Sequence, residues 1–363
     1  MLKYLFLFII LLHGLIHFMG FAKAHGYGEM KQLTQPISKP TGSLWMLTAL
    51  LFITAAVLLL LKKESWMWIA LPAVVISQVL IIMVWKDAKW GTIANFLILI
   101  VALLSFTTWR FEQQFKGDVK RLIQQTPSDV KLITEMDLQH LPQPVQQYLR
   151  YSGVVGTPYP HNMYVKFNGE MRSREKDWFS FTSEQYNFFD KPSRLFFMKG
   201  KMFGLTVPGY HRYENQKALM HIKLFGLIDV VNIDGPEITK GETVTVLNDM
   251  CLMAPASLLS KQIAWEAIDS LKSKIVFTNG AIKVSAVLYF NEKGQLIDFI
   301  SNDRYETNTK QWLPFSTPVS EYQPMNGMNL IAYGEAVWHY TDSAFVYGKF
   351  RTNKIEYNVK ELK

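Results

Sequence analysis

Residues 4–22 read YLFLFIILLHGLIHFMGFA, a run of nineteen residues without a charged side chain. Three further charge-free apolar runs occupy residues 40–61, 65–85 and 90–109, and nothing similar follows residue 110. A helix needs about 20 apolar residues to cross the ~30 Å hydrocarbon core of a bilayer. The sequence therefore predicts an integral membrane protein, with a four-helix transmembrane module at residues 1–110 ahead of a large soluble domain.

The charge of the chain is concentrated in this module. Residues 1–110 hold nine Lys/Arg and three Asp/Glu, which accounts for most of the net charge of +8. Basic residues beside apolar helices meet anionic headgroups. Residues 111–363 are close to neutral and lack the excess of Lys and Arg that is typical of a nucleic-acid-binding surface. We expect the lipid bilayer as a partner and exclude nucleic acid.

The connections between the apolar runs set their topology. The connections are so short, at residues 62–64 and 86–89, that the helices they join must be antiparallel neighbours. Counting basic residues on the two sides gives seven with the N-terminus and soluble domain against five opposite. This favours a soluble domain on the cytoplasmic side of the membrane. The Ala22-Lys23-Ala24 triplet resembles a leader cleavage site, but the length of the first run favours a retained helix.

Two histidines interrupt the first apolar run. His13 and His17 are spaced i, i+4 and project from one helix face, and Gln78 and Asn95 in later runs are candidate partners. Ionisable residues at bilayer depth suggest a functional site, here a metal, redox or proton site. The alternative is a hydrogen-bonded cluster that fixes helix packing. We favour this alternative because no further histidine or carboxylate lies within a span, and we assign no metal or cofactor.

A helical connector is predicted over residues 111–160. Apolar residues recur near helical spacing from Phe111 to Ile123, which continues the fourth span beyond the membrane. Prolines at 142 and 144 and a glycine at 153 then bracket a short helix near residues 143–152. Val145, Tyr148 and Leu149 form its predicted buried face.

From residue 161 to 363 the hydrophobic period changes to two. Residues 163–168, 282–290 and 354–359 alternate between apolar and polar, and turn signals such as Asp234-Gly235-Pro236 separate the runs. Asn279-Gly280 between two such runs predicts a type I′ hairpin. About ten short strands imply a curved antiparallel β-sheet or open barrel. One helical interruption near residues 247–261 is expected to pack across the concave side, which makes this an α+β domain.

Aromatic residues are unusually frequent in the predicted strands. Trp178, Phe181, Phe196 and Tyr213 are candidates for lining a site that encloses an apolar ligand. The alternative is that the sheet packs these rings against its own helices.

Residue patterns that specify catalysis are missing from this sequence. It contains no Gly-x-Ser-x-Gly elbow, no Walker loop after a strand and no His-Glu-x-x-His. His211 and His221 are predicted on adjacent strands but lack a third metal ligand. The apolar neighbours of Cys251 predict a buried, inert thiol. Arg172 is a candidate anion contact, with a strand-end salt bridge as the commoner outcome.

Several motifs of the soluble domain resemble a bacterial family of unknown function. They are LPQPVQQYL at residues 141–149, GEMR at 169–172 followed by Trp178 and Phe181, GLTVPGYHRY at 204–213, and MAPASLL at 253–259. LHGLIH at 12–17 and WKDAKWGT at 85–92 resemble the four-helix module of some members. The resemblance implies no activity. It supports the domain boundaries and, through members without a membrane segment, a cytoplasmic domain.

These observations lead to one principal hypothesis and two alternatives. The principal hypothesis is a membrane-tethered, non-catalytic binding module for an apolar or lipid-like ligand. The first alternative is a redox, metal or proton site on the His13/His17 face. The second is a protein-interaction or sensory module with an unidentified protein partner.

Overall fold

The computed structural model describes residues 2–202 and 205–363, so that Gly204 of the third motif lies outside the described residues. The chain divides into two compact units. A helical unit comprises Met1–Phe111 and Phe225–Leu227, and a β unit comprises Glu112–Leu224 and Ile228–Lys363.

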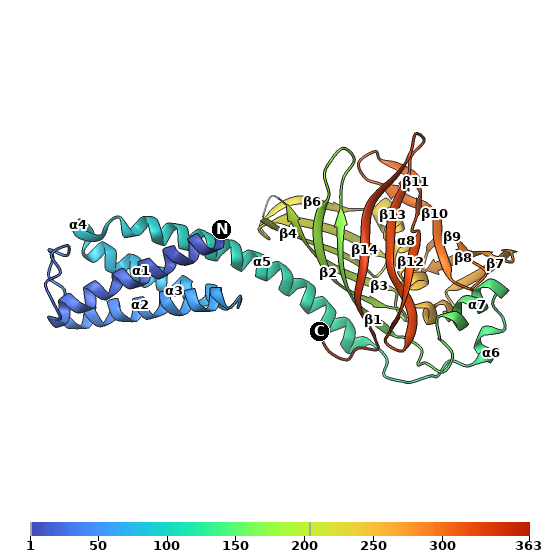
Figure 1. The fold of residues 1–363 in the computed structure, drawn as a ribbon, viewed down its shortest axis with the longest axis horizontal. Coiled ribbons are helices and arrows are strands. Elements are labelled where there is room, and N and C mark those ends of the chain that lie inside the picture. The colour runs from blue at the N-terminus through green and yellow to red at the C-terminus, as the bar shows by residue number, and fades with distance from the viewer. Residues whose placement is uncertain (1, 203–204) are drawn as a thin grey trace. The chain divides into compact units, whose positions relative to one another are not determined.

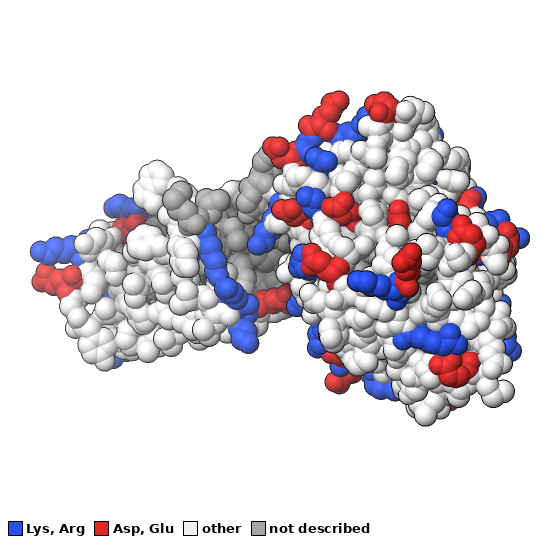
Figure 2. All heavy atoms as spheres, turned by 45° about the vertical axis from the view of Figure 1, so that its right-hand side comes forward, with Lys and Arg blue, Asp and Glu red and all other residues white. Residues whose placement is uncertain are grey.

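Four long apolar helices make up most of the helical unit, together with one short helix. They are α1 (Leu2–His25), α2 (Lys39–Leu60), α3 (Trp66–Met83), α4 (Trp85–Ala88) and α5 (Gly91–Gln125). All except α4 are long and apolar enough to cross a membrane. Figure 2 shows this unit almost free of charged side chains between its ends. The predicted four-helix module is confirmed.

Small residues allow α1 and α2 to approach closely. A Cβ atom on Gly20 would lie 2.2 Å from the indole of Trp45, and one on Gly42 would lie 2.3 Å from the Cβ of Ala24. Lipid tails are as apolar as helix side chains, so the hydrophobic effect does not drive helices together in a membrane, and they associate through such close packing instead. Glycine at these two positions therefore sets the α1–α2 distance.

The predicted extension of the fourth span is confirmed, since α5 runs without a break to Gln125 before Thr126-Pro127. The predicted connector helix is also present as α7 (Gln143–Tyr151), after a single turn α6 (Glu135–Leu138). Gly153 follows α7 with φ +73°, the left-handed conformation of a glycine cap. Val145, Tyr148 and Leu149 are all buried.

One antiparallel sheet forms the β unit, and in Figure 1 it curls into a half-barrel. Its strands are β1 (Asn162–Met171), β2 (Phe179–Phe188), β3 (Ser193–Met202), β4 (Leu205–Glu214), β5 (Lys217–Leu224), β6 (Ile228–Asp234), β7 (Ile263–Asp269), β8 (Lys272–Asn279), β9 (Ile282–Phe290), β10 (Leu296–Glu306), β11 (Gln311–Ser316), β12 (Val319–Met325), β13 (Met328–His339) and β14 (Ala344–Tyr357). The spatial order is 6-5-4-3-2-1-14-13-11-10-9-8-7, with β12 paired to β13. The curved antiparallel sheet is as predicted, although the described residues form fourteen strands rather than about ten.

The helix α8 (Pro236–Met253) and the 3₁₀ turn η1 (Pro255–Leu259) lie within the curve of the half-barrel (Figure 1). We call the sheet face toward them the inner face. Leu247, Met250 and Cys251 of α8 are fully buried there with Val165, Phe277 and other strand residues, in the largest hydrophobic cluster of the β unit.

Two predictions about turns were wrong. Asp234-Gly235-Pro236 is the start of α8 rather than a turn between strands, because proline is accepted at the first helical position. The hairpin at Asn279-Gly280 exists, but its central residues are Gly280 and Ala281. Of these two only Gly280 has a positive φ, at +60°, whereas a type I′ turn needs both.

Candidate functional site

A buried ion-pair cluster fastens α8 to the inner face. One carboxylate oxygen of Asp249 accepts hydrogen bonds from Gln185 Nε2 at 2.8 Å, Asn187 Nδ2 at 2.9 Å and Arg194 Nε at 2.8 Å. Arg194 also donates to Gln185 Oε1 at 2.9 Å and to Glu242 at 3.3 Å. Because alternate residues of β2 and β3 point inward, three polar side chains converge on a single helix residue. The cluster is almost fully bonded, which favours a structural role for it.

His211 faces the same interior from β4. Burial lowers the pKa of His211 to about 4. The carboxylate of Glu242 opposes this shift, whereas the charges of Arg194 and Arg304 add to it. The imidazole is therefore neutral at neutral pH.

We expect the β unit to lose stability in acid through His211. Since the folded-state pKa lies below the ordinary value of 6.5, the stabilisation is complete above pH 6.5 and disappears as the pH falls toward 4. Between pH 7 and pH 4, the free energy of unfolding of the parent should therefore fall by roughly 1–2 kcal/mol more than that of a His211→Gln variant. Urea unfolding of the detergent-solubilised chain at a series of pH values measures this. Parallel stability curves for parent and variant would contradict it.

An arginine covers an aromatic group farther along the inner face. The guanidinium carbon of Arg304 lies 4.1 Å from the ring centroid of Phe315 and 5.4 Å from that of Trp338. Its Nη1 donates to the Tyr347 hydroxyl at 3.4 Å, and the ring of Tyr347 stacks on Trp338 at 6.0 Å. We call these four residues the arginine–aromatic cluster. Phe350 packs against both this group and the main core, which places the cluster on the inner face.

This cluster differs from the main core in how it is covered. Phe315 and Trp338 pair directly between β11 and β13, and both are buried. No described residue of α8 belongs to their hydrophobic cluster. The half-exposed side chains of Arg304 and Tyr347 cover them instead. The site is thus an apolar surface under a half-exposed polar cover.

A second arginine reaches the neighbouring part of β14. Arg172 donates from Nε to the carbonyl of Val346 at 2.9 Å, and its guanidinium carbon lies 4.4 Å from the Trp178 ring and 4.9 Å from the Phe345 ring. Lys349 Nζ lies 4.6 Å from the same indole. The strand-end salt bridge expected for Arg172 is not found among the described residues, because the guanidinium lies between aromatic rings instead.

The candidate lining residues fall into two places. Phe181, Phe196 and Tyr213 belong to the main hydrophobic cluster of the inner face. Tyr213 is fully buried, and its hydroxyl accepts a hydrogen bond from Asn279 Nδ2 at 2.8 Å. Trp178 is half-exposed and lies apart from them, beside Arg172. Sequence reasoning did not single out Arg304, Phe315, Trp338 or Tyr347, which come from four different strands.

The opposite face of the sheet carries the end of α5. Phe115 stacks on Phe197 at 5.3 Å and meets the edge of the Tyr210 ring at 5.5 Å. The Glu112 carboxylate is paired with Lys199 at 2.6 Å. This segment of α5 covers the outer face of β2 to β4.

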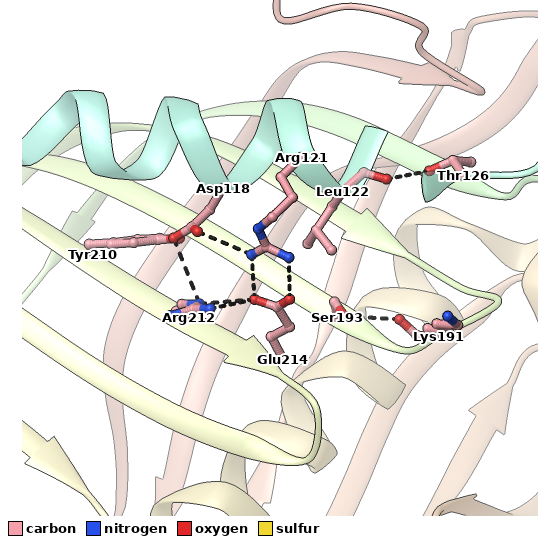
Figure 3. A network of polar contacts seen from close by, with 9 residues as sticks. All are labelled: Asp118, Arg121, Leu122, Thr126, Lys191, Ser193, Tyr210, Arg212 and Glu214. Atoms are coloured by element: carbon pink, nitrogen blue, oxygen red, sulfur yellow. Dashed lines mark hydrogen bonds and ion pairs between the residues drawn. The ribbon is translucent and has the colours of Figure 1, made fainter. Parts of the chain in front are cut away.

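Beyond Phe115 a polar network holds this segment in place (Figure 3). Arg121 makes two hydrogen bonds to Glu214, at 2.6 and 2.8 Å, and Arg212 donates to the same carboxylate at 2.6 Å. Asp118 accepts from the Tyr210 hydroxyl at 2.9 Å. The hydrogen bonds from Arg121, with those from Arg212, hold the pKa of Glu214 below its ordinary value. Every charge is matched, so this network anchors the helix and offers no site for a further ion.

The two histidines of the helical unit lie in a hydrogen-bonded group with both candidate partners. His17 Nδ1 donates to the His13 carbonyl at 2.7 Å, so its Nε2 accepts from the Ser77 hydroxyl at 2.9 Å. His13 Nε2 lies 2.9 Å from Asn95 Oδ1, and Asn95 Nδ2 donates to Gln78 Oε1 at 3.1 Å. This arrangement is consistent with two neutral imidazoles that join α1, α3 and α5.

Other titratable candidates do not assemble into sites. His211 and His221 lie on adjacent strands, but His221 pairs with Tyr210, so the two side chains point to opposite faces. Cys251 is buried, as predicted, and burial raises the pKa of its thiol. The acidic side chains that the sequence places near one turn are Asp229, Asp234 and Glu237, and Asp229 pairs with Lys223 at 3.3 Å. Within residues 2–202 and 205–363, no three His, Cys, Asp or Glu residues are grouped as metal ligands.

A cleft of about 830 Å³ opens elsewhere, between the β4–β5 turn and the start of α8. Its lining combines charged and polar residues, such as Arg212, Glu214 and Asp234, with apolar residues, such as Leu219, Pro236 and Ile282.

A comparison with protein families matches most of the β unit. A family described as "Family of unknown function (DUF6544)" matches residues 131–350, which contain α6, α7, α8 and the sheet apart from the end of β14. No curated protein matches the sequence. A crystal structure of a LolA superfamily protein from Nitrosomonas europaea is similar over 59% of this chain and 93% of that chain, with 7% identity and a TM-score of 0.35.

Proposed function

The chain belongs to the family of unknown function DUF6544, so that membership supplies no activity, and we propose a function from the geometry of the chain itself. The protein is a membrane-tethered, non-catalytic binding module for an apolar or lipid-like ligand. Residues 1–110 form the transmembrane module, residues 111–160 the connector and residues 161–363 the binding domain. The basic residues number seven on the side of the N-terminus and the soluble domain against five on the other, which favours a cytoplasmic domain, and the family resemblance favours a bacterial inner membrane.

The arginine–aromatic cluster is the observation that carries this proposal. Most of the inner face is filled by α8 and the main core, and there the aromatic rings pack against the protein's own helix. At Phe315 and Trp338 the apolar surface is covered instead by half-exposed Arg304 and Tyr347. Rotation of the Arg304 side chain exposes the rings of Phe315, Trp338 and Tyr347 on a curved sheet, which suits an alkyl chain.

Photolabelling of the full chain tests the proposal. The protein is reconstituted in phosphatidylcholine nanodiscs that contain a trace of diazirine-bearing palmitic acid, and labelled peptides are mapped by mass spectrometry. We expect saturable labelling of residues 311–316 and 328–357. Tyr347→Ala removes a ring of the cluster and should reduce this labelling about threefold to tenfold, since an aromatic contact contributes about 0.5–1.5 kcal/mol.

Tyr333→Ala is the matched control for Tyr347→Ala. Tyr333 is also a half-exposed tyrosine of the same sheet. Its neighbour Gly334 pairs with Phe350 and points to the inner face, so Tyr333 points to the outer face. Its loss should leave the labelling unchanged. Labelling confined to residues 1–110, or equal effects of the two variants, would refute the proposed function.

The alternative functions have weaker support. A metal or redox site on the His13/His17 face would need free imidazole nitrogens, but both nitrogens of His17 and Nε2 of His13 have protein partners. These contacts favour a role in packing the helices. A sensory or protein-docking role rests on no particular contact of the described residues.

A further inference from the structure

We propose that the ligand of the arginine–aromatic cluster is an amphiphile with an anionic headgroup, a carboxylate or phosphate, which Arg304 binds with help from Arg172. This inference rests on the proposed function and names the chemistry of its ligand.

The first argument is the pairing of arginines. In the described β unit, all arginines except Arg172 and Arg304 have a carboxylate oxygen within 4.0 Å; the paired ones are Arg121, Arg150, Arg174, Arg194, Arg212 and Arg351. The two exceptions are both half-buried and both lie over aromatic rings. A guanidinium in such surroundings is partly desolvated and lacks a counter-ion, so an incoming anion finds an unsatisfied partner.

The second argument is convergence. The backbone N–H of Arg172 donates to the carbonyl of Tyr347 at 2.9 Å and its side chain donates to the carbonyl of Val346. Arg304 donates to the hydroxyl of Tyr347 at 3.4 Å. Arg172, which directly follows β1, and Arg304 of β10 therefore donate hydrogen bonds from their guanidinium groups to adjacent residues of β14, Val346 and Tyr347.

The third argument is the charge of the interior. Arg194 is neutralised by Asp249 and Glu242, whereas Arg304, whose charge also reaches His211, has no such carboxylate partner among the described residues. The planar fork of an arginine matches a carboxylate or phosphate in a bidentate contact. An anionic headgroup at Arg304, with its chain on Phe315 and Trp338, satisfies both the charge and the apolar surface.

Comparison of charged and uncharged probes tests this inference. Diazirine-bearing palmitic acid and the matching diazirine-bearing palmityl alcohol are presented to the full chain in phosphatidylcholine nanodiscs at pH 8. We expect the acid to label residues 311–316 and 328–357 at least about tenfold more than the alcohol, because a hydrogen bond to an ion exceeds one to a neutral group. Arg304→Met should reduce acid labelling to the level of the alcohol, and Arg304→Lys should retain part of the preference.

Arg351→Met is the matched control. Arg351 is exposed and paired with Glu321 at 2.6 Å, so its replacement removes the same charge without touching the cluster, and the acid preference should persist. If Arg304→Met does not fold, the comparison of acid with alcohol on the parent and on Arg304→Lys decides the question.

The outcomes separate the two proposals. Equal labelling of these segments by acid and alcohol would overturn the anionic headgroup while the proposed function stands. Absence of labelling by both probes would overturn both. Competition against the acid by inorganic phosphate at concentrations no higher than those at which octyl phosphate competes would show that a free anion suffices and would overturn the amphiphile.

Discussion

Replacement of Asp249 by alanine should destabilise the β unit by about 3–5 kcal/mol. The Asp249 carboxylate is the common acceptor for Gln185, Asn187 and Arg194. Its removal leaves the Arg194 guanidinium buried with only Glu242 at 3.3 Å as a counter-ion, and leaves two buried amide groups without their acceptor. A buried charge without a close partner costs far more than an intact pair contributes.

The measurement is urea unfolding of the full chain in detergent, followed by near-ultraviolet circular dichroism. Asp342→Ala is the control because it also breaks an arginine pair, with Arg174 at 2.7 Å, but on the exposed surface. We expect no measurable change for that control. Asp249→Asn, which keeps the size of the side chain but not its charge, should be destabilised less than Asp249→Ala. Equal stability of Asp249→Ala and Asp342→Ala would show that the cluster does not hold α8.

The second large effect is expected in the helical unit, where Gly20→Val should destabilise the bundle by about 3 kcal/mol or more. The first added carbon would lie 2.2 to 2.7 Å from three atoms of the Trp45 indole. Trp45 is buried and packs with Leu80 and Val84, so its ring has no free space into which to move. The clash would therefore push α1 away from α2 and disturb the contact between His17 and Trp45, whose rings lie 5.0 Å apart.

Titration with sodium dodecyl sulfate measures the stability of this unit. The control is Gly117→Ala in the part of α5 that belongs to the β unit, where a Cβ would meet no atom within 4 Å. Alanine is the better helix former, so this control should be neutral or stabilising by up to about 1 kcal/mol. A Gly20→Val protein as stable as the parent would contradict the close approach of α1 and α2.

Much of the fold could be predicted because its signals are local. The four spans follow from unbroken apolar runs, and α7 follows from Pro142, Pro144 and Gly153, which set its two ends. Alternation predicted β1 and β9, since each has one face on the core. Where two local signals compete the prediction was wrong, as at Pro236, which is a turn residue but is also accepted in the first turn of a helix.

The candidate site could not be predicted because it depends on register and strand order. Phe315 and Trp338 pair only because β11 lies beside β13 while β12, between them in sequence, does not separate them. The register also shifts between Ser301 and Arg304 in β10 and between Ala336 and Val337 in β13. Each shift changes which side chains share a face, so alternation alone cannot bring Arg304 and Tyr347 together.

The hydrogen-bonded histidine group of the helical unit was partly visible in the sequence. The i, i+4 spacing placed His13 and His17 on one face, and Gln78 and Asn95 stood out as polar residues in apolar runs. Ser77, which hydrogen-bonds to His17, did not stand out in the sequence, because serine is common in membrane helices and carries no charge.

The distribution of diazirine label along the full chain tests the central claim most directly. If the inner face of the half-barrel binds an apolar chain, saturable label from the palmitic acid probe lies on residues 311–316 and 328–357, in addition to any label that the membrane helices receive from the surrounding lipid. Label confined to residues 1–110, with the strands around Phe315, Trp338 and Tyr347 unmodified, would contradict the claim and leave the half-barrel as a folded domain without a lipid-like ligand.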